Sequence, residues 1–428
     1  MSVRVIKLGG TSQSLESYNN LIKVLNENID DKFVIVLSAI SQVTNLLVDT
    51  NIKKCENINR LIKIHNDFLK KLNITEIKDT IFTMIKYSFI NYNDKLQDKI
   101  NKISLGEHLS SIILNYYLNK NNIKTEIIMA SDIIKSNFDN DSLYQLNDIY
   151  FDSKYILERF EKNNILITQG FIGSTKNNKL FLLGRGGSDT SGSIIAKELK
   201  AKEYQIWTDV NGIYNIDPRL NSDAKVLKQI DYELAQEMAG MGAKVLHPYC
   251  IKPCQENNIP IIIKNSKNIY DDFTIINNEI NTSSCCLTYQ KNISIFKIKT
   301  LEMWHNTGFA SNIFKIFSDN KVDIDIITTS QYEITVTSKN LEKNTIKIII
   351  DKLEEKYQVK YFNTFEQVSI TSRNILAFDK LPSIQELIKE FQFRILLQTF
   401  NSNNFAISFL INRKYSTAFI NQIYNIIK

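Results

Sequence analysis

The chain has little glycine, and the few glycines that it has are clustered. It holds 13 glycines in 428 residues, about 3% where an average protein has about 7%. Twelve of them lie before residue 243, mostly in short groups, and the last is Gly308. Glycine lets backbone N–H groups approach a ligand closely, and adjacent N–H groups form sites that bind anions. The clusters therefore predict a phosphate site in the N-terminal part of the chain.

Arginine is also scarce, because only 8 of the 52 basic residues are Arg. Two of these, Arg185 and Arg219, lie within or beside glycine clusters. An Arg side chain can bind a carboxylate or a phosphate through two parallel hydrogen bonds, whereas Lys acts as a point charge. We therefore expect these two arginines to contact ligands.

Long apolar runs, blocks of like charge and a cysteine framework are absent from the sequence. No apolar run reaches the roughly 18 residues that span a bilayer, and a strand-like segment from residue 3 leaves no room for a signal peptide. The net charge is +6 without any run of five like charges, so the basic patch of a nucleic-acid-binding protein is missing. The five cysteines lack His partners at metal-ligand spacing. We therefore expect a soluble, cytoplasmic protein with reduced thiols, no metal site of its own, and no nucleic-acid or membrane partner.

Up to about residue 285, short apolar strands alternate with helical patterns. Near-continuous apolar strands of this kind are typical of an α/β fold, in which helices sandwich a mainly parallel sheet. Between residues 50 and 120, apolar residues spaced by three and four predict a helical insertion. The strands are expected at 3–8, 33–38, 126–131, 165–170, 179–184, 204–209 and 259–264.

After residue 285 the order strand, helix, strand, strand, helix, strand appears, and a shorter version follows it. This order predicts two ferredoxin-like βαββαβ modules. We expect a catalytic domain over 1–285 and a regulatory region over 286–428. Within that region the first module covers about 300–364 and the second about 365–428, with 288–299 as a candidate to complete the second.

Two glycine clusters at strand ends indicate phosphoryl transfer. The segment Lys7-Leu8-Gly9-Gly10 places an ammonium group just before a backbone anion site, whereas in a P-loop the Lys follows the glycines. The cluster from Gly184 to Asp189 supplies Arg185 for a carboxylate and Asp189 for organising lysines or a Mg²⁺-bound nucleotide. Phosphoryl transfer needs mainly positioning and positive charge around the moving group. Lys7 and Lys244 are the candidates for that charge.

Seven segments, in this order, resemble the signature segments of aspartate kinases in the amino acid kinase family. The resemblance covers nearly the whole chain, and the C-terminal repeat is similar to the paired ACT domains of the lysine-inhibited monofunctional branch. It implies phosphorylation of the β-carboxylate of L-aspartate with ATP and Mg²⁺, the first step of the diaminopimelate pathway to lysine, threonine and methionine. The segments are VIKLGGTS, SAISQVTN, SLGEHLS, ITQGFIGS, LGRGGSDTSG, IWTDVNGIYNIDPR and EMAGMGAKVLHP.

The same resemblance implies a role for each site residue. Lys7 and Lys244 would stabilise the transferring phosphoryl group, and Asp189 would hold the lysines and the metal in place. Glu107 would pair the α-ammonium group of aspartate, and Arg185 its α-carboxylate. The other substrate contacts would be Thr44, Phe171, Gly186, Gly187 and Ser188, and the nucleotide contacts Lys7, Gly9, Gly10, Thr208, Asp209, Tyr214, Arg219 and Lys244.

The first C-terminal module is expected to bind an effector. Gly308 precedes a helix whose N-terminal N–H groups can receive a carboxylate, and Asp325 can accept an ammonium group, so both residues suit lysine. Gln331 replaces the Glu usual in the lysine-inhibited branch, and Leu8 and Thr190 also depart from the family pattern, which leaves the effector and the kinetics open. Sheet edges of ACT modules favour pairing between chains, so we expect a homodimer or larger. The predicted effector residues are Met303, Asn306, Gly308, Phe309 and Asp325.

Two alternative functions stay open. The first is another carboxylate kinase of the same fold, acting on glutamate or an N-acylated amino acid. Glu107 argues against an acylated substrate, because an acylated amine carries no charge to pair. The second is a non-catalytic amino-acid sensor, which predicts the loss of Lys7, Asp189 or Lys244, yet all three are present.

Overall fold

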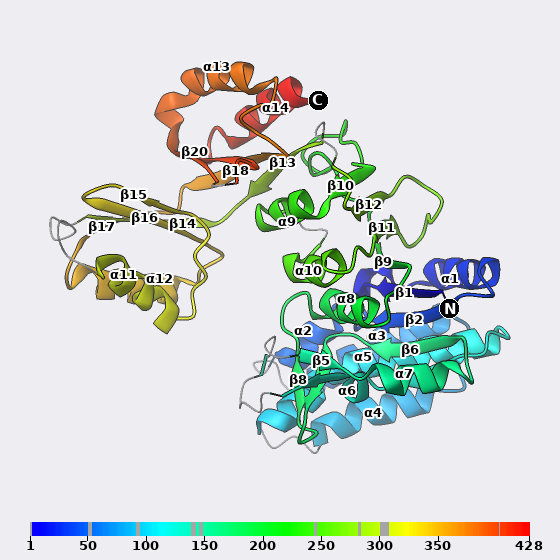
Figure 1. Cartoon of the computed structure of the whole chain (residues 1–428). Coiled ribbons are helices and arrows are strands. Elements are labelled where there is room, and N and C mark those ends of the chain that lie inside the picture. The colour runs from blue at the N-terminus through cyan, green and yellow to red at the C-terminus, as the bar shows by residue number, and fades with distance from the viewer. Residues whose placement is uncertain are drawn as a thin grey trace. The chain divides into compact units, whose positions relative to one another are not determined.

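In the computed structural model, two compact units are formed (Figure 1). Unit 1 spans 1–213, 226–239 and 244–281, and unit 2 spans 214–225, 240–243 and 282–428. Two short segments of the expected catalytic domain therefore belong to the C-terminal unit, which differs from a single boundary near residue 285. The structure describes residues 2–49, 54–90, 95–137, 143–144, 149–243, 246–280, 284–299, 308–401 and 403–428.

The described part of unit 1 is built on an eight-stranded sheet in the order β10-β12-β11-β9-β1-β2-β6-β3. Strand β1 lies near its centre, between β2 and β9, and is parallel to both. Only the pair β11 and β12 is antiparallel among the pairs described in this sheet. The predicted α/β fold with a mainly parallel sheet is thus confirmed. The strands are β1 (Val3–Leu8), β2 (Lys32–Leu37), β3 (Glu126–Ile128), β6 (Ile165–Gln169), β9 (Glu203–Thr208), β10 (Gln229–Asp231), β11 (Ile261–Asn265) and β12 (Thr274–Asn277).

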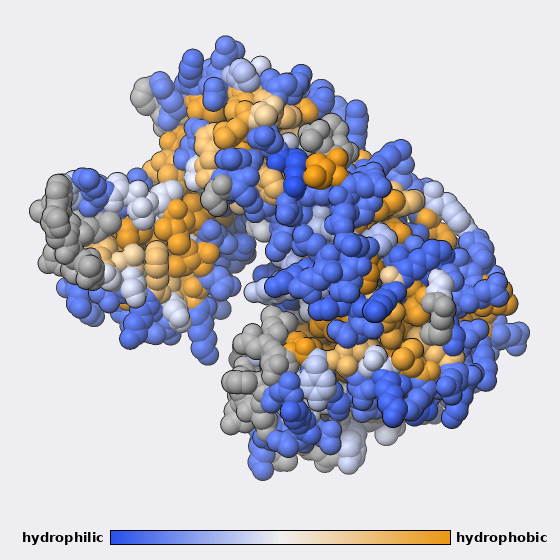
Figure 2. Space-filling model, viewed as in Figure 1, coloured by the Kyte–Doolittle hydropathy of each residue, from blue (hydrophilic) through white to orange (hydrophobic). Residues whose placement is uncertain are grey.

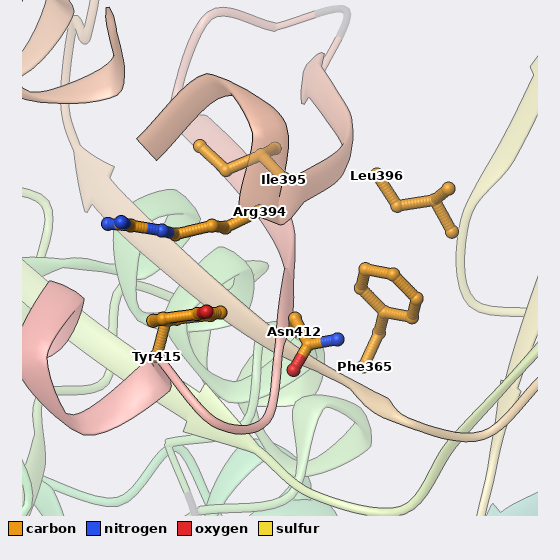
Figure 3. A pocket seen from close by; sticks show the side chains of 6 residues that line it. All are labelled: Phe365, Arg394, Ile395, Leu396, Asn412 and Tyr415. Carbon is orange, nitrogen blue, oxygen red and sulfur yellow. The ribbon is translucent and has the colours of Figure 1, made fainter. Parts of the chain in front are cut away.

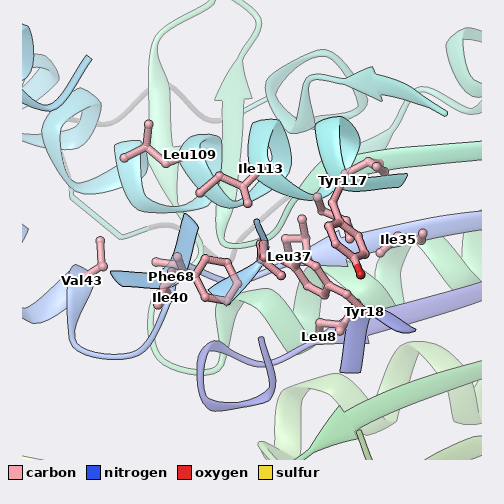
Figure 4. Close-up of a cluster of buried hydrophobic side chains, with 14 of the residues drawn as sticks. Leu8, Tyr18, Ile35, Leu37, Ile40, Val43, Phe68, Leu109, Ile113 and Tyr117 are labelled. Atoms are coloured by element: carbon pink, nitrogen blue, oxygen red, sulfur yellow. The ribbon is translucent and has the colours of Figure 1, made fainter. Parts of the chain in front are cut away.

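The predicted helical insertion consists of α3, α4 and α5. On α5, Leu109, Ile113 and Tyr117 recur every fourth residue and face Ile35 and Leu37 of β2 in one buried cluster (Figure 4). This packing fixes the helix on the sheet. The helices of unit 1 are η1 (Gly10–Ser12), α1 (Leu15–Glu27), α2 (Val43–Val48), α3 (Lys54–Lys71), α4 (Lys78–Ile90), α5 (Leu96–Lys120), α6 (Ala130–Ile133), α7 (Ser153–Phe160), α8 (Gly187–Glu198), α9 (Tyr232–Gly240, whose last residue belongs to unit 2), η2 (Pro248–Cys250) and α10 (Ile251–Gln255).

A second, four-stranded sheet in the order β5-β4-β7-β8 corrects the prediction for residues 179–184. This segment is not part of the main sheet, because β8 pairs antiparallel with β7. The hairpin reverses at Asn178, which has a φ of 58°, and asparagine tolerates that left-handed conformation. The strands are β4 (Ile134–Ser136), β5 (Ile149–Phe151), β7 (Ile172–Thr175) and β8 (Leu180–Leu182).

Unit 2 contains two ferredoxin-like modules. The first has the sheet order β15-β16-β14-β17, and the second has the order β13-β18-β20-β19. In the second module β13 occupies the place of the fourth strand, because it pairs antiparallel with β18 at the edge of the sheet. The second module is thus completed by β13. The segment 288–299, predicted as the candidate for this role, also includes β14, which belongs to the first module. The elements are β13 (Cys285–Gln290), β14 (Ile293–Lys299), α11 (Phe309–Asp319), β15 (Ile327–Thr329), β16 (Glu333–Lys339), α12 (Lys343–Glu354), β17 (Gln358–Phe362), β18 (Phe365–Ser372), α13 (Leu381–Phe391), η3 (Gln392–Arg394), β19 (Ile395–Phe400), β20 (Ala406–Asn412) and α14 (Ser416–Ile427).

Each module has its own apolar core, centred on Phe296 and Phe317 in the first and on Phe409 and Phe419 in the second. Hydrophilic residues cover much of the face shown in Figure 2. Across the described residues, no helix is both long and apolar enough to cross a membrane.

Candidate active site

The carboxyl end of β1 and the start of α8 bring Lys7 and Asp189 together. Lys7 Nζ lies 2.5 Å from Asp189 Oδ1, and the two side chains are only 11% and 16% exposed. Strand β1 is fixed by its neighbours on both sides, and Asp189 lies in the first turn of α8. Two residues that the sequence predicts from separate motifs therefore form one ion pair.

The turn after β1 is held close to neighbouring backbone. The N–H of Gly9 donates to Trp207 O over 3.2 Å, and Ser41 N donates to Gly10 O over 3.1 Å. A Cβ on Gly10 would lie 2.4 Å from the carbonyl oxygen of Ala39. Since backbone cannot move aside as a side chain can, glycine is needed at this position. The glycine-rich turn is thereby held in a fixed position next to Lys7.

Helix α8 begins in a left-handed turn that also requires glycine. Gly186 caps the helix with a φ of 70°, and Thr190 N donates to its carbonyl oxygen over 3.0 Å. The hydroxyl of Tyr204 donates to Asp189 O over 2.9 Å, so a buried residue of β9 holds the helix turn that carries the carboxylate. Sequence reasoning missed Tyr204. The sequence feature that could have indicated a close neighbour here is Gly192 on α8. A Cβ at this position would lie 2.5 Å from the Tyr204 hydroxyl.

Phe171 adopts a φ of 70°, which is uncommon for an aromatic residue. Its N–H donates to Ser191 Oγ over 2.9 Å, and its carbonyl accepts from Leu183 N over 2.8 Å. A Cβ on Gly187 would lie 2.5 Å from the Phe171 ring. Surroundings that hold an unfavourable backbone conformation are typical of functional sites. Phe171 and Gly187, both predicted to serve the substrate, thus lie in contact at the start of α8.

Ser188 lies at the same place. A Cβ on Gly170 would lie 2.6 Å from Ser188 Cβ, so the end of β6 passes directly over α8. Arg185 is exposed and has no ion-pair partner among the residues that the structure describes. Its guanidinium group is therefore available to a ligand. Thr44 lies on α2, is half-buried, and has no described contact with these residues.

Glu107 is a buried carboxyl group on α5, 3% exposed. Ala39 N donates to its Oε1 over 3.2 Å, while Oε2 has no hydrogen-bond partner in the described chain. Burial raises the pKa of Glu107 to about 8 and outweighs the hydrogen bond from Ala39, which lowers it. A buried polar atom without a partner is costly. This oxygen therefore suits a donor supplied by a ligand.

His247 is a neighbour of the site that sequence reasoning did not assign to it. A Cβ on Gly186 would lie 2.5 Å from His247 Cβ, and the imidazole ring centroid lies 5.3 Å from that of Tyr249. Burial lowers the pKa of His247, and the charge of Arg185 lowers it further, against the opposing effect of Asp189. Together these effects favour the neutral imidazole over the imidazolium.

The predicted nucleotide residues are divided between the units. Thr208 ends β9 in unit 1, and its Oγ1 donates to Asp209 Oδ1 over 3.2 Å. Tyr214 and Arg219 belong to unit 2. The guanidinium group of Arg219 forms two hydrogen bonds with Asp217, of 3.0 and 2.7 Å, so a phosphate would have to displace this half-buried carboxylate partner. Lys244 lies outside the described residues.

Three of the five predicted effector residues lie in the described part of the first module. Gly308 has a φ of 86° and caps α11. Asp325 N donates to Thr337 O over 2.9 Å, and its carboxylate lies 3.1 Å from Lys339 Nζ. Phe309 is buried in the module's core. Met303 and Asn306 lie outside the described residues.

The second module carries a pocket of about 320 Å³. In Figure 3 the guanidinium group of Arg394 lies over the ring of Tyr415, with 4.5 Å between its Cζ and the ring centroid. None of the predicted effector residues lines this pocket. Its lining residues are Phe365, Arg394, Ile395, Leu396, Asn412 and Tyr415.

A magnesium ion carried by a nucleotide fits the carboxylates of unit 1. Within the described chain, no group of three or more His, Cys, Asp or Glu is arranged to hold a metal. Mg²⁺ usually keeps several waters and needs only one or two carboxylates beside the phosphates. Asp189, paired with Lys7, and exposed Asp209 are the candidates.

Known proteins that are similar to this chain include members of the amino acid kinase family and aspartokinases. The profile of the amino acid kinase family matches residues 2–265. Lysine-sensitive aspartokinase 3 of Escherichia coli is 29% identical over 361 residues, which cover 78% of this chain and 77% of that protein. Aspartokinase III of E. coli, solved with aspartate and ADP in its R-state, has a TM-score of 0.83 at 23% identity and 99% coverage of both chains. Its T-state complex with lysine and aspartate has a TM-score of 0.78 at 24% identity and 100% coverage of both. The predicted resemblance to aspartate kinases is confirmed by these relatives.

Proposed function

Since the chain belongs to the amino acid kinase family, we propose that it is an aspartate kinase. The reaction transfers the γ-phosphoryl group of ATP to the β-carboxylate of L-aspartate, giving 4-phospho-L-aspartate and ADP. The relatives support this substrate, because they are aspartokinases and one was solved with aspartate and ADP. In this proposal the enzyme acts in the cytoplasm, as a homodimer or larger, at the first step of the diaminopimelate pathway.

The ammonium group of Lys7 acts on the phosphoryl group in transfer. Negative charge spreads over the phosphoryl oxygens in the transition state, and a fixed positive group beside them lowers the barrier. Asp189, 2.5 Å from Lys7 Nζ, keeps that group at the end of β1. Lys244 supplies a second positive charge. Mg²⁺ on the nucleotide would neutralise further phosphate charge, and Asp189 and Asp209 are the candidates to hold it.

The buried carboxyl group of Glu107 is the observation that best supports a substrate with a free ammonium group. Its Oε2 is buried and lacks a donor within the described residues. An ammonium group offers three donors and a charge, so it satisfies this oxygen and favours the ionised carboxylate. An N-acylated amino acid offers neither the charge nor the same donors. A kinase acting on such substrates is therefore less well supported than an aspartate kinase.

Arg185 recognises the α-carboxylate of the substrate. Its guanidinium group is exposed at the start of α8 and has no described ion-pair partner. It can therefore bind a carboxylate through two parallel hydrogen bonds. Phe171, Ser188 and the backbone of Gly186 and Gly187 form the adjoining wall, and Thr44 completes the substrate contacts.

Lysine is the proposed effector, bound in the first module. A relative that is named as lysine-sensitive and a related structure solved with lysine support this assignment. Asp325 would exchange its Lys339 partner, 3.1 Å away, for the ammonium group of the ligand. The N-terminus of α11, capped by Gly308, would face the carboxylate.

An assay of ADP release tests the activity. Wild-type protein with ATP and Mg²⁺ should release ADP with L-aspartate, far less with L-glutamate, and not with N-acetyl-L-aspartate. The Glu107→Gln variant should lose activity with L-aspartate, because a neutral amide pairs the ammonium group weakly. Equal activity with N-acetyl-L-aspartate would favour the acyl-amino-acid kinase instead. No activity with any carboxylate, together with nucleotide binding, would favour a sensor.

A further inference from the structure

The loop formed by residues 214–225 belongs to unit 2 although both its flanks belong to unit 1. It contains Tyr214 and Arg219, the two nucleotide residues that are not in unit 1. Two hydrogen bonds join the ends of the loop, from Asn215 N to Lys225 O over 2.9 Å and from Lys225 N to Asn215 Oδ1 over 2.8 Å. The loop is therefore a closed structure with fixed ends.

The hydroxyl of Tyr424 on α14 lies between the two ends of this loop. It donates to Asp223 O over 2.8 Å and accepts from Asn215 Nδ2 over 3.5 Å. The Tyr424 side chain is fully buried in the core of the second module. A single rigid hydroxyl thus links residues near both ends of the loop to the last helix of the chain.

Strand β13 holds the same loop from another side. Leu287 N donates to Asn215 O over 2.7 Å, and the Cys286 thiol donates to Tyr214 O over 3.4 Å. Ile216 is 1% exposed and belongs to the same apolar cluster as Tyr424. The residues around Tyr214 are therefore positioned by the second module.

A second short segment shows the same attachment. Met241 Sδ accepts from Gln367 Nε2 over 3.8 Å and from Ser408 Oγ over 3.7 Å. Gly242 has a φ of 105°, and a Cβ there would lie 2.6 Å from Gln290 Nε2. This segment directly precedes Lys244 in the sequence. Both short segments that unit 2 takes from the N-terminal part of the chain, 214–225 and 240–243, are thus anchored on β13, β18, β20 or α14.

We propose that Tyr424 is a positioning residue for the nucleotide: its hydroxyl holds the loop 214–225 in the conformation that presents Tyr214 and Arg219 to ATP. The proposal rests on the proposed function, because it takes these two residues as nucleotide contacts. Arg219 must leave Asp217 to meet a phosphate. Because Tyr424 fixes the two ends of the loop, only its middle part has to move when Arg219 leaves Asp217 for a phosphate. ATP binding therefore does not have to order the whole loop.

The test is Tyr424→Phe, which removes the hydroxyl and keeps the ring in the core. The KM for ATP should rise about tenfold, which corresponds to the loss of one to two hydrogen bonds, while the KM for aspartate at saturating ATP stays unchanged. Tyr289→Phe is the matched control. That hydroxyl is also in the second module, where it donates to Glu366, and among the described residues it forms no hydrogen bond with the loop. The control should leave both KM values unchanged.

A second variant covers the case in which Tyr424→Phe fails to fold. Asn215→Ala keeps the Tyr424 ring in the core and removes the side chain that donates to its hydroxyl over 3.5 Å and accepts from Lys225 N over 2.8 Å, and it should also raise the KM for ATP. Equal effects of Tyr424→Phe and Tyr289→Phe, or an equal rise in both KM values, would overturn the proposal.

Calorimetric binding of a non-hydrolysable ATP analogue with Mg²⁺ separates this inference from the proposed function. Weaker binding to Tyr424→Phe supports the inference even if aspartate is not the acceptor, and unchanged binding refutes it.

Discussion

The ammonium group of Lys7 lies 2.5 Å from the carboxylate of Asp189, and this ion pair joins the central strand of the kinase sheet to the first turn of α8. Both groups are largely removed from solvent, where an unpaired charge is costly. The pair keeps a positive charge fixed at a strand end before any phosphate arrives. Preorganised charge of this kind needs little rearrangement during the reaction.

Replacement of Lys7 by alanine should remove most of the turnover. The loss should be about 10²–10³-fold or more in kcat, because the ammonium group acts on charge that is greatest in the transition state. Steady-state kinetics would measure it, with the circular dichroism spectrum as a check of the fold. Lys197→Ala breaks the exposed pair with Glu256, 2.8 Å long, and should leave turnover near the wild-type value. A Lys7→Ala enzyme with nearly normal kcat would remove Lys7 from the mechanism.

The raised pKa of Glu107 predicts how aspartate affinity depends on pH. Burial raises this pKa from 4.5 to about 8, so at neutral pH the free enzyme holds the proton. The substrate ammonium group needs the carboxylate, so kcat/KM for aspartate should increase as the pH rises towards about 8. Calorimetry in buffers of different ionisation enthalpy should show proton release when aspartate binds. Glu107→Gln should abolish both effects.

The same group affects the stability of the free protein. A carboxyl whose pKa is higher in the folded state contributes stability that is complete below its unfolded pKa and is lost as the pH rises to the folded value. For Glu107 this interval runs from 4.5 to about 8. Wild-type Tm, measured relative to Glu107→Gln, should therefore fall across that interval. A constant difference between the two proteins would mean that the pKa of Glu107 is not raised.

Arg185→Lys keeps the positive charge but loses the planar fork of the guanidinium group. The KM for aspartate should rise by about 10- to 100-fold, as expected for the loss of a hydrogen bond between charged groups. The KM for ATP should change little. If instead only the KM for ATP rose, Arg185 would be a nucleotide residue. Initial rates over a grid of both substrate concentrations distinguish the two results.

Two glycines offer a direct test of the close approach after β1. In Gly10→Ala the new methyl group would lie 2.4 Å from the carbonyl oxygen of Ala39, so we expect a lower Tm and strongly reduced activity. Gly240 has no atom within 4 Å of such a methyl group, so Gly240→Ala should be neutral or slightly stabilising. If both variants had the wild-type Tm, the close packing of the turn would be disproved.

The sequence allowed accurate prediction where one local pattern determines one element. Apolar periodicity indicated the helical insertion, and the glycine clusters indicated the turns that hold Lys7 and Asp189. It failed where the partner is distant in the chain. Nothing local in residues 285–290 shows that this strand completes a module whose other strands begin at Phe365. The role of Tyr204 under Asp189 likewise depends on a contact between β9 and α8.

The division of the nucleotide residues was also beyond local analysis. The segment around Tyr214 and Arg219 follows β9 in sequence, so assignment to the catalytic domain was the natural prediction. Its attachment to unit 2 comes from Tyr424, about two hundred residues later, and from backbone pairing with Leu287. Such contacts are set by tertiary packing, which propensity and motif spacing do not report.

Asp325→Ala should relieve inhibition by lysine and leave the uninhibited turnover unchanged. Inhibition requires lysine to bind the inactive state more tightly than the active one, with a typical coupling of about 1–3 kcal/mol. Removal of the carboxylate takes away the proposed partner of the ligand's ammonium group, so the inhibitory concentration of lysine should rise about 10-fold or more. Asp323→Ala, on the same segment and exposed, is the matched control and should keep wild-type inhibition. Threonine should be assayed in parallel, because Gln331 departs from the lysine-inhibited pattern. If millimolar lysine had no effect on the wild-type enzyme, the assignment of lysine as effector would be refuted.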